Sequence, residues 1–285
     1  MQIFPRYAGP PVLSIPGAPA DQLAHSARQR RRMATMLAGL SDLEWATQSR
    51  CAEWTVQGVV AHLVGTNAFW QASVLAGLAG NPTRILGAFD PATTPPMMVS
   101  AMSALAPHEV LEQFISSNES FLGVLFALSD EEWMKPAETP AGHVPIRLLA
   151  FHALWDIWIH ERDVALPLGL PCVLEDDELA SCLRYAAAIS PVLAIGFGHE
   201  PKGMFAVVAT DPDIRFVLEV GSEVKLIDDF EADDNTPCLR GTAVELVEAL
   251  SIRTALPATA PAEWRQLLTG LAKAFDTPGG EMRHA

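Results

Sequence analysis

Hydrophobic and polar positions follow a helical period through most of the first 195 residues. In five segments, apolar side chains recur every three or four positions, which places them on one face of an α-helix. The predicted helices cover residues 21–39, 56–78, 107–128, 144–166 and 176–195. Three strand-like stretches follow at 204–209, 214–220 and 223–227, and two more helices are predicted at about 242–254 and 262–275.

Capping residues and prolines support these boundaries. Asp21 and Thr55 each precede an apolar helical repeat and can accept hydrogen bonds from its first free amides. Pro167 ends the fourth helix, and Pro171 marks a boundary between the helical half and the remainder. The sequence therefore predicts a mainly α protein with an α+β second domain. Its parts are an N-terminal arm (1–20), a four-helix bundle (21–170) and a C-terminal α+β domain (171–285).

A short motif occurs once in each half of the predicted bundle. Leu-Ser-Asp-x-Glu-Trp occupies residues 40–45 and again 128–133. Each copy is followed by a polar loop and then by an apolar helix that carries an inward-facing histidine. Two such helical hairpins pack as a four-helix bundle, in which metal sites are built from facing helices. The alternative is that the motif is only a common way of capping a turn.

The fourth predicted helix combines an apolar surface with one stripe of ionisable side chains. His152, Asp156, His160 and Asp163 lie three or four residues apart, and apolar side chains cover most of the remaining surface. A helix that is apolar on nearly all sides is buried. Because burying an isolated carboxylate is costly, Asp156 is expected to have a partner inside the protein.

A metal ion is the partner that this spacing favours. Asp156 and His160 stand at i and i+4, so both can reach one ion, and His62 on the second helix can supply a third ligand. We therefore predict a metal site at His62, Asp156 and His160. The alternative is a structural network in which Asp156 and His160 pair with each other or with Arg147 or Arg162.

Other polar residues have simpler interpretations. His152 is interpreted as a hydrogen-bonded core residue, and Asp163 as a group that supports a ligating histidine or pairs with Arg162. Cys51 has no base beside it in the sequence and is interpreted as a buried or semi-buried thiol. The four cysteines have no CxxC spacing and are too few for a disulfide scaffold, so reduced thiols are expected.

Charge and composition narrow the class of partner. Asp plus Glu outnumber Lys plus Arg by 34 to 19, which gives a net charge of −15 and a pI near 4.8. This balance disfavours nucleic acid and an anionic membrane as partners. The chain has neither a transmembrane-length apolar run nor the apolar segment of a signal peptide. We expect a cytoplasmic protein that acts on a small molecule; no oligomeric state is predicted.

Two longer motifs surround the candidate ligands. The first runs from Ser49 to Leu63 and includes Cys51, Trp54-Thr-Val and His62. The second comprises Gly142-His-Val-Pro and Asp-x-x-x-His-x-x-Asp-Val-Ala-x-x-x-Gly at 156–169. In order and spacing, both resemble the motifs of the mycothiol-dependent maleylpyruvate isomerase family, whose members have a DinB-like four-helix bundle. Weaker similarities to that family's small α+β domain occur at 209–211 and 241–243.

The resemblance implies residue roles and cofactors. It places a zinc site at His62, Asp156 and His160, with mycothiol as the thiol cosubstrate. The family has Glu where this chain has Asp156, which is one methylene shorter and requires closer helices or a shifted metal. Arg253 matches an arginine that assists catalysis in the isomerase; its alternative is a surface or helix-terminal cation.

These residues imply thiol chemistry. Metal coordination would convert a thiol with an ordinary pKa of about 8.5 into a thiolate at neutral pH. We expect a metal-dependent, mycothiol-using enzyme, either an S-transferase acting on a small electrophile or thiol conjugate or a maleylpyruvate-type cis–trans isomerase. The S-transferase is preferred, because Asp156 in place of the family's glutamate and the additional N-terminal arm indicate that this chain has diverged from the isomerases. A non-catalytic DinB-like binding protein with a structural or absent metal is the alternative. Zinc is the expected ion, although histidine-carboxylate sites also accept iron, nickel and manganese.

Overall fold

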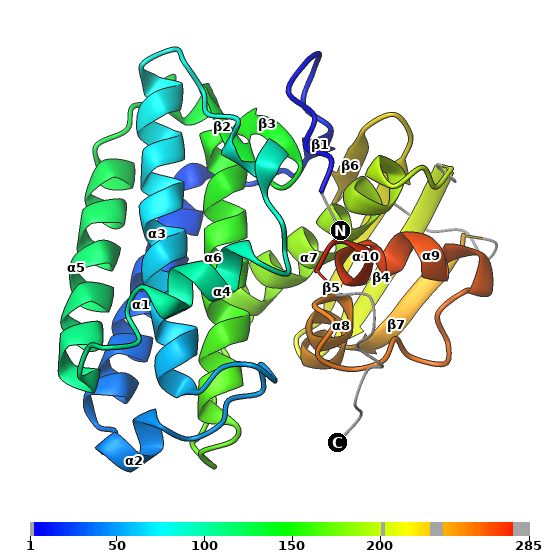
Figure 1. Cartoon of the computed structure of the whole chain (residues 1–285). Helices are drawn as coiled ribbons and strands as arrows, with labels where there is room; N and C mark the ends of the chain where they lie inside the picture. Colours follow the sequence, from blue (N-terminus) through cyan, green and yellow to red (C-terminus); the bar gives the residue numbers. More distant parts are fainter. Residues whose placement is uncertain (1–2, 201–202, 229–235, 276–285) are drawn as a thin grey trace.

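A helical bundle and a sheet-containing domain lie side by side (Figure 1). The computed structural model describes residues 3–200, 203–228 and 236–275. Short helices α2 (Asp42–Trp45) and α4 (Thr94–Ser100) lie in the connections, with 3-10 turns at Ile85–Ala88 and Glu132–Met134. The bundle consists of α1 (Pro19–Ala38), α3 (Val56–Leu78), α5 (Pro107–Phe126) and α6 (Ile146–Ala165).

The four predicted bundle helices are confirmed, with boundaries within two residues of those expected. Thr55 caps α3 by accepting a hydrogen bond from the Gly58 amide. Asp21 is not a cap: α1 begins at Pro19, whose fixed φ suits the first turn of a helix. The connection at 79–106, for which no helix was predicted, contains α4.

Both copies of the repeated motif fold into the same capped turn. In the first, the Ser41 amide donates to Glu44 at 2.7 Å, and the Glu44 amide donates to the Ser41 hydroxyl. In the second, Ser129 and Glu132 exchange the same pair of hydrogen bonds. The tryptophan that ends each copy is buried against the bundle. The repeat therefore fixes how the chain enters each hairpin's second half.

A β-hairpin before α6 was missed by the sequence pattern. Strands β2 (Pro136–Thr139) and β3 (Gly142–Pro145) pair antiparallel, so α6 begins at Ile146 rather than at Val144. The physical reason is that a residue preceding proline disfavours helical backbone angles, and Pro145 follows Val144. The hairpin carries the fully buried Glu138. Its carboxylate accepts hydrogen bonds from the backbone amides of Ile85 and Leu86, at 2.9 and 2.8 Å.

The second domain is α+β, as predicted. Helix α7 (Asp176–Gly196) packs against α6 and the sheet, and α8 (Ala243–Leu250), a 3-10 turn (Ala262–Trp264), α9 (Arg265–Leu268) and α10 (Gly270–Phe275) follow. The sheet has the order β1-β6-β5-β4-β7. Its strands are β1 (Leu13–Ser14), β4 (Gly203–Thr210), β5 (Ile214–Val220), β6 (Val224–Ile227) and β7 (Cys238–Thr242). Strands β1 and β7 were not predicted, α8 ends four residues earlier than expected, and the last predicted helix is divided.

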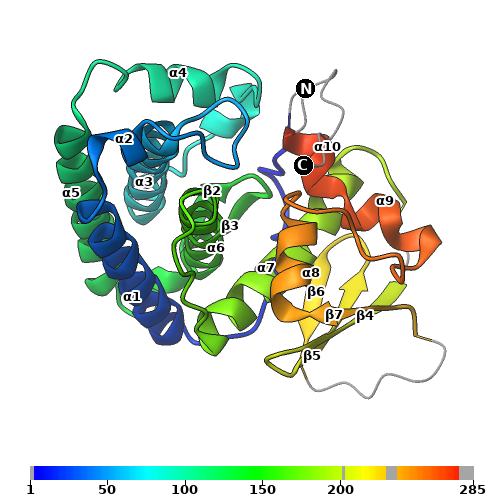
Figure 2. The ribbon, with the colours of Figure 1, turned by 90° about the horizontal axis from the view of Figure 1, so that it is seen from below.

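The predicted N-terminal arm connects the two domains. β1 pairs in parallel with β6, which makes the arm an edge strand of the second domain's sheet. Closer to the N-terminus, the Arg6 amide donates to the Ala141 carbonyl and the His143 amide donates to the Arg6 carbonyl, each at 3.1 Å. The arm is thus hydrogen-bonded to both domains before α1 begins. It passes between them in Figure 2.

Helix α7 is central to both domains. Among the described residues, it is the one helix long and apolar enough to cross a membrane, and 78% of that apolar window is buried inside the protein. Such burial is typical of the core helix of a globular fold.

His152 lies in the core, as expected. Its side chain is buried, and Nδ1 lies 2.5 Å from the Tyr185 hydroxyl. The rings of Trp70 and Trp155 pack around it at centroid distances of 4.5 and 5.4 Å. Burial lowers the pKa of His152 from 6.5 to about 4, so the folded protein holds the neutral imidazole.

This buried histidine predicts acid destabilisation. Between pH 6.5 and about 4 the unfolded chain binds a proton at His152 that the folded protein does not, so stability falls as pH falls. At about 1.4 kcal/mol per pKa unit, the loss reaches about 3 kcal/mol. Urea unfolding with chelator present, across this range, should show a smaller decrease for His152→Gln than for the wild type. Equal decreases in the free energy of unfolding for the two proteins would contradict the assignment of this acid destabilisation to His152.

Candidate metal centre and its support across the domain interface

The three predicted ligands converge at one point between α3 and α6. Ligand atoms of His62, Asp156 and His160 all lie within 4.8 Å of one another. His160 Nε2 is 3.7 Å from Asp156 Oδ1, and the rings of His62 and His160 meet edge to face at 5.0 Å. The i, i+4 spacing on α6 places two of these groups, and the neighbouring helix α3 supplies the third.

The donor set fits a divalent cation. His62 Nδ1 is buried and has no hydrogen-bond partner among the described residues. Burial lowers the pKa of His62 to about 4, which keeps the imidazole neutral, the form that binds metals. Burial by itself raises the pKa of Asp156, but the nearby imidazoles of His160 and His62 lower it by more. The net shift of this pKa is downward, so the side chain stays a carboxylate. Two imidazoles and one carboxylate are a common zinc ligand set that leaves a fourth position open.

Asp163 orients His160. Asp163 Oδ2 lies 2.9 Å from His160 Nδ1, so the opposite nitrogen, Nε2, faces Asp156. Carboxylates behind a ligating imidazole fix its tautomer and its ring orientation in this way. Burial lowers the pKa of His160, but Asp163, Cys51 and Asp156 together raise it to about 10. Without a metal, His160 is therefore the imidazolium, and metal binding must displace its proton.

The alternative to a metal site was a structural network in which Asp156 and His160 pair with each other or with Arg147 or Arg162, and only some of these contacts form. Asp156 and His160 do pair at 3.7 Å, which is the contact that this alternative requires. Arg147 instead donates to the Ile15 carbonyl, and Arg162 donates to Glu248 at 2.6 Å. Neither arginine thus serves as the partner that the alternative proposed.

Arg253 reaches this site from the second domain. It follows α8 in a turn where Ile252 has φ +58°, a left-handed conformation that is costly for a β-branched residue. The turn directs the guanidinium onto the buried Asp163 carboxylate, with Nε at 2.9 Å from Oδ1 and Nη2 at 2.7 Å from Oδ2. Arg50 donates a further hydrogen bond to the same carboxylate, from Nε to Asp163 Oδ1 at 3.0 Å. Arg253 is therefore ion-paired with a buried carboxylate, although its side chain keeps 19% exposure.

Cys51 lies in the same cluster. Its Sγ is 3.3 Å from Asp163 Oδ2, 3.9 Å from His160 Nδ1 and 3.9 Å from Arg253 Nη2. The thiol is semi-buried, as predicted, but basic groups do surround it. They were missed because they come from α6 and from the segment after α8, more than 100 residues along the chain.

One family model matches the part of the chain that contains the candidate site. Residues 26–165, which contain all three candidate ligands, match the family model described as the mycothiol maleylpyruvate isomerase N-terminal domain. The match covers the helices of the bundle and ends where α6 ends, before the second domain. No curated protein sequence is a significant match.

The fold is also similar to that of solved structures. The crystal structure of the mycothiol-dependent maleylpyruvate isomerase matches with a TM-score of 0.60 and 14% identity, over 84% of this chain and 91% of that one. A crystal structure of a histidine-to-alanine variant of that enzyme matches with the same values. Because the shared region is longer than the bundle, the likeness extends into the second domain.

Further polar contacts cross the domain interface beside the site. Glu248 on α8 accepts from Arg162, and an Arg50 nitrogen lies 2.8 Å from it. Trp155 donates to the Ser251 hydroxyl at 2.8 Å. Sequence reasoning missed Arg50 and Glu248. Arg50 lies next to Cys51 in the motif at 49–63, and this position was the available signal that Arg50 is near the site.

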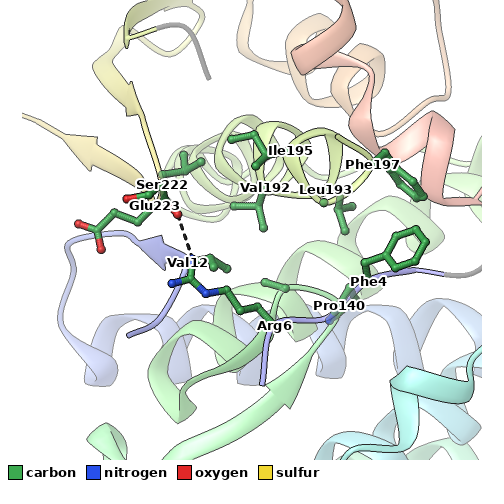
Figure 3. A pocket seen from close by; sticks show the side chains of 13 residues that line it. Phe4, Arg6, Val12, Pro140, Val192, Leu193, Ile195, Phe197, Ser222 and Glu223 are labelled. Atoms are coloured by element: carbon green, nitrogen blue, oxygen red, sulfur yellow. Dashed lines mark hydrogen bonds between the residues drawn. The ribbon is translucent and has the colours of Figure 1, made fainter. Parts of the chain in front are cut away.

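A separate cavity of about 200 Å³ lies between the N-terminal arm and the C-terminal end of α7 (Figure 3). Its lining is largely apolar, and Arg6 closes one end by donating to the Ser222 carbonyl at 3.1 Å. The three candidate ligands are not part of its lining. It is therefore distinct from the metal centre.

The position of Arg253 predicts that it acts through Asp163. Arg253→Ala should lower turnover about 10- to 100-fold, the usual effect of removing a group that orients a metal ligand. Steady-state kinetics of Arg253→Ala, Asp163→Asn and the double variant test this, because groups acting through one contact give non-additive losses. Fully additive losses would instead assign Arg253 an independent role.

Proposed function

We propose that this protein is a metal-dependent, mycothiol-using enzyme in which His62, Asp156 and His160 hold a divalent cation, with zinc the first candidate. The observation that carries the proposal is the convergence of three ligand atoms within 4.8 Å inside the family domain. The unpartnered Nδ1 of His62 supports it. Mycothiol is proposed as the thiol because the structurally similar enzyme is described as mycothiol-dependent.

The residues around the cation have separable roles. Bound zinc would lower the pKa of a thiol that enters its open position, so that thiolate is available at neutral pH. Asp163 accepts a hydrogen bond from His160 Nδ1, which leaves Nε2 free for the cation. Arg253 and Arg50 hold Asp163 in place. The Trp54 ring packs beside the His62 ring, with the two centroids 4.9 Å apart.

Two reactions share the first step that this site supports. The thiolate sulfur forms a bond to an electrophilic carbon, and the displaced electron pair moves onto the conjugated carbonyl oxygen. In a cis–trans isomerase, rotation follows and the sulfur leaves with its electron pair. In an S-transferase, the carbon–sulfur bond remains, and the enolate takes up a proton from water to give the neutral conjugate and hydroxide. The family likeness supports the isomerase, whereas Asp156 in place of glutamate is the feature that favours the transferase.

An assay with purified, zinc-loaded protein separates these outcomes. Turnover of maleylpyruvate that requires mycothiol would assign the isomerase, and conjugation of mycothiol to electrophiles without isomerisation would assign the S-transferase. Asp156→Ala should remove either activity, whereas His108→Ala, at an exposed histidine on α5, should retain it. Zinc-loaded protein without either activity would contradict the proposal and indicate a non-catalytic binding protein.

A further inference from the structure

One face of α3 carries His62 between two glycines. Gly58 precedes His62 by four residues and Gly65 follows it by three, so all three positions lie on the same helical stripe. Because glycine has no side chain, the surface of α3 is hollow on either side of the imidazole. Asp156 lies next to this stripe, since a carboxylate oxygen of Asp156 is within 4.8 Å of a ring nitrogen of His62.

The short helix α4 covers this stripe. A Cβ added at Gly58 would lie 3.5 Å from Val99 Cγ1, and one added at Gly65 would overlap the terminal methyl group of Met98. Met98 and Val99 therefore contact α3 at positions on either side of His62. Figures 1 and 2 show α4 lying across α3, outside the ring of bundle helices.

Helix α4 is weakly packed, whereas the segments on either side of it are anchored. None of its seven residues, all in the described part of the chain, is buried, and Met97 is 67% exposed. On one side, the amides of Ile85 and Leu86 donate to buried Glu138. On the other side, Gln57 of α3 donates to the Leu105 carbonyl at 2.9 Å. Met98 can therefore change its rotamer, or α4 can shift, without breaking these anchoring hydrogen bonds.

We infer that Met98 forms an adjustable wall over the His62 side of the candidate metal centre and determines the size of electrophile that the site accepts. The inference rests on the proposed function, because it takes His62 as a metal ligand. Methionine is unbranched and has three rotatable bonds, so it fills the hollow at Gly65 yet can withdraw from it. Trp54, whose ring packs at 4.9 Å from the His62 ring, forms a second wall. This pair suits a small electrophile with a flat, apolar unsaturated group.

The first test does not require a bound metal. Metal-free protein is treated with diethyl pyrocarbonate, and mass spectrometry follows labelling of the peptide that contains His62. Met98→Ala should label His62 several-fold faster than the wild type, whereas Met98→Leu should restore slow labelling. Met97→Ala is the matched control on the same helix and should leave the rate unchanged. The exposed His108 peptide serves as an internal reference. Equal His62 rates in Met98→Ala, Met97→Ala and wild type would overturn the inference.

The second test uses zinc-loaded protein with mycothiol and a series of electrophiles of increasing size. Met98→Ala should raise the ratio of kcat/KM for the largest to that for the smallest member about tenfold or more, mainly by lowering KM, because one or two methylenes in an apolar pocket change specificity by that amount. An unchanged ratio would overturn the inference. Absence of zinc binding would instead contradict the proposed function, and the labelling result would still decide whether Met98 covers His62.

Discussion

Replacing His62 with alanine is expected to lower bound zinc from about one equivalent to almost none and to reduce mycothiol-dependent turnover roughly a thousandfold or more. Removing one of three protein ligands leaves only Asp156 and His160, both on α6. A catalytic metal supplies several kcal/mol of stabilisation in the transition state, and each 1.4 kcal/mol is about a tenfold change in rate. Elemental analysis and steady-state kinetics on matched preparations measure the two effects.

The stability of this variant separates a lost ligand from a damaged fold. His62 Nδ1 is buried without a partner among the described residues, so its removal should leave the metal-free protein at least as stable as the wild type. Zinc at about 100 times its Kd should stabilise the wild type by about 2.7 kcal/mol and the variant hardly at all. His108→Ala should behave as wild type. Full zinc occupancy and turnover in His62→Ala would exclude His62 as a ligand.

Replacing Asp163 with asparagine is expected to weaken zinc binding about 10- to 100-fold, although Asp163 is not a proposed ligand. The carboxylate contacts His160, Arg253 and Arg50, and asparagine removes the negative charge that all three share. Because breaking a buried ion pair leaves uncompensated charge, the free energy of unfolding should also fall, by about 3 kcal/mol or more. Competition with a chelator measures zinc affinity, and urea unfolding of metal-free protein measures stability.

A surface carboxylate provides the control for this variant. Asp213 is 68% exposed and pairs with Arg215, so Asp213→Asn should change stability by less than about 1 kcal/mol and zinc affinity not at all. If Asp163→Asn binds zinc as tightly as Asp213→Asn does, His160 does not depend on Asp163 for its orientation.

The bundle could be predicted from sequence because its signals are local. The bounds of α3 agree with the expectation because Thr55 caps its start. The pairing of β1 with β6 could not be predicted in this way, since Leu13 and Val224 are far apart along the chain. The two-residue length of β1 also leaves no alternating pattern to recognise.

The same distinction applies to the candidate site. Asp156 and His160 share one helix, so their spacing alone places them together, and the repeated hairpin pointed to His62. The contacts of Cys51 and Arg253 with Asp163 cross the domain interface, which helical periodicity does not describe. The left-handed turn that directs Arg253 to the site depends on Ile252, a residue type that gives no signal for such a turn.

X-ray absorption at the zinc edge, on zinc-loaded protein before and after addition of mycothiol, tests the central claim most directly. We expect two imidazole ligands and oxygen ligation before addition, with a new zinc–sulfur distance of about 2.3 Å afterwards. His62→Ala should give neither spectrum. Failure of the wild type to bind one equivalent of zinc, or zinc ligation that mycothiol leaves unchanged, would contradict a thiol-activating metal centre at His62, Asp156 and His160.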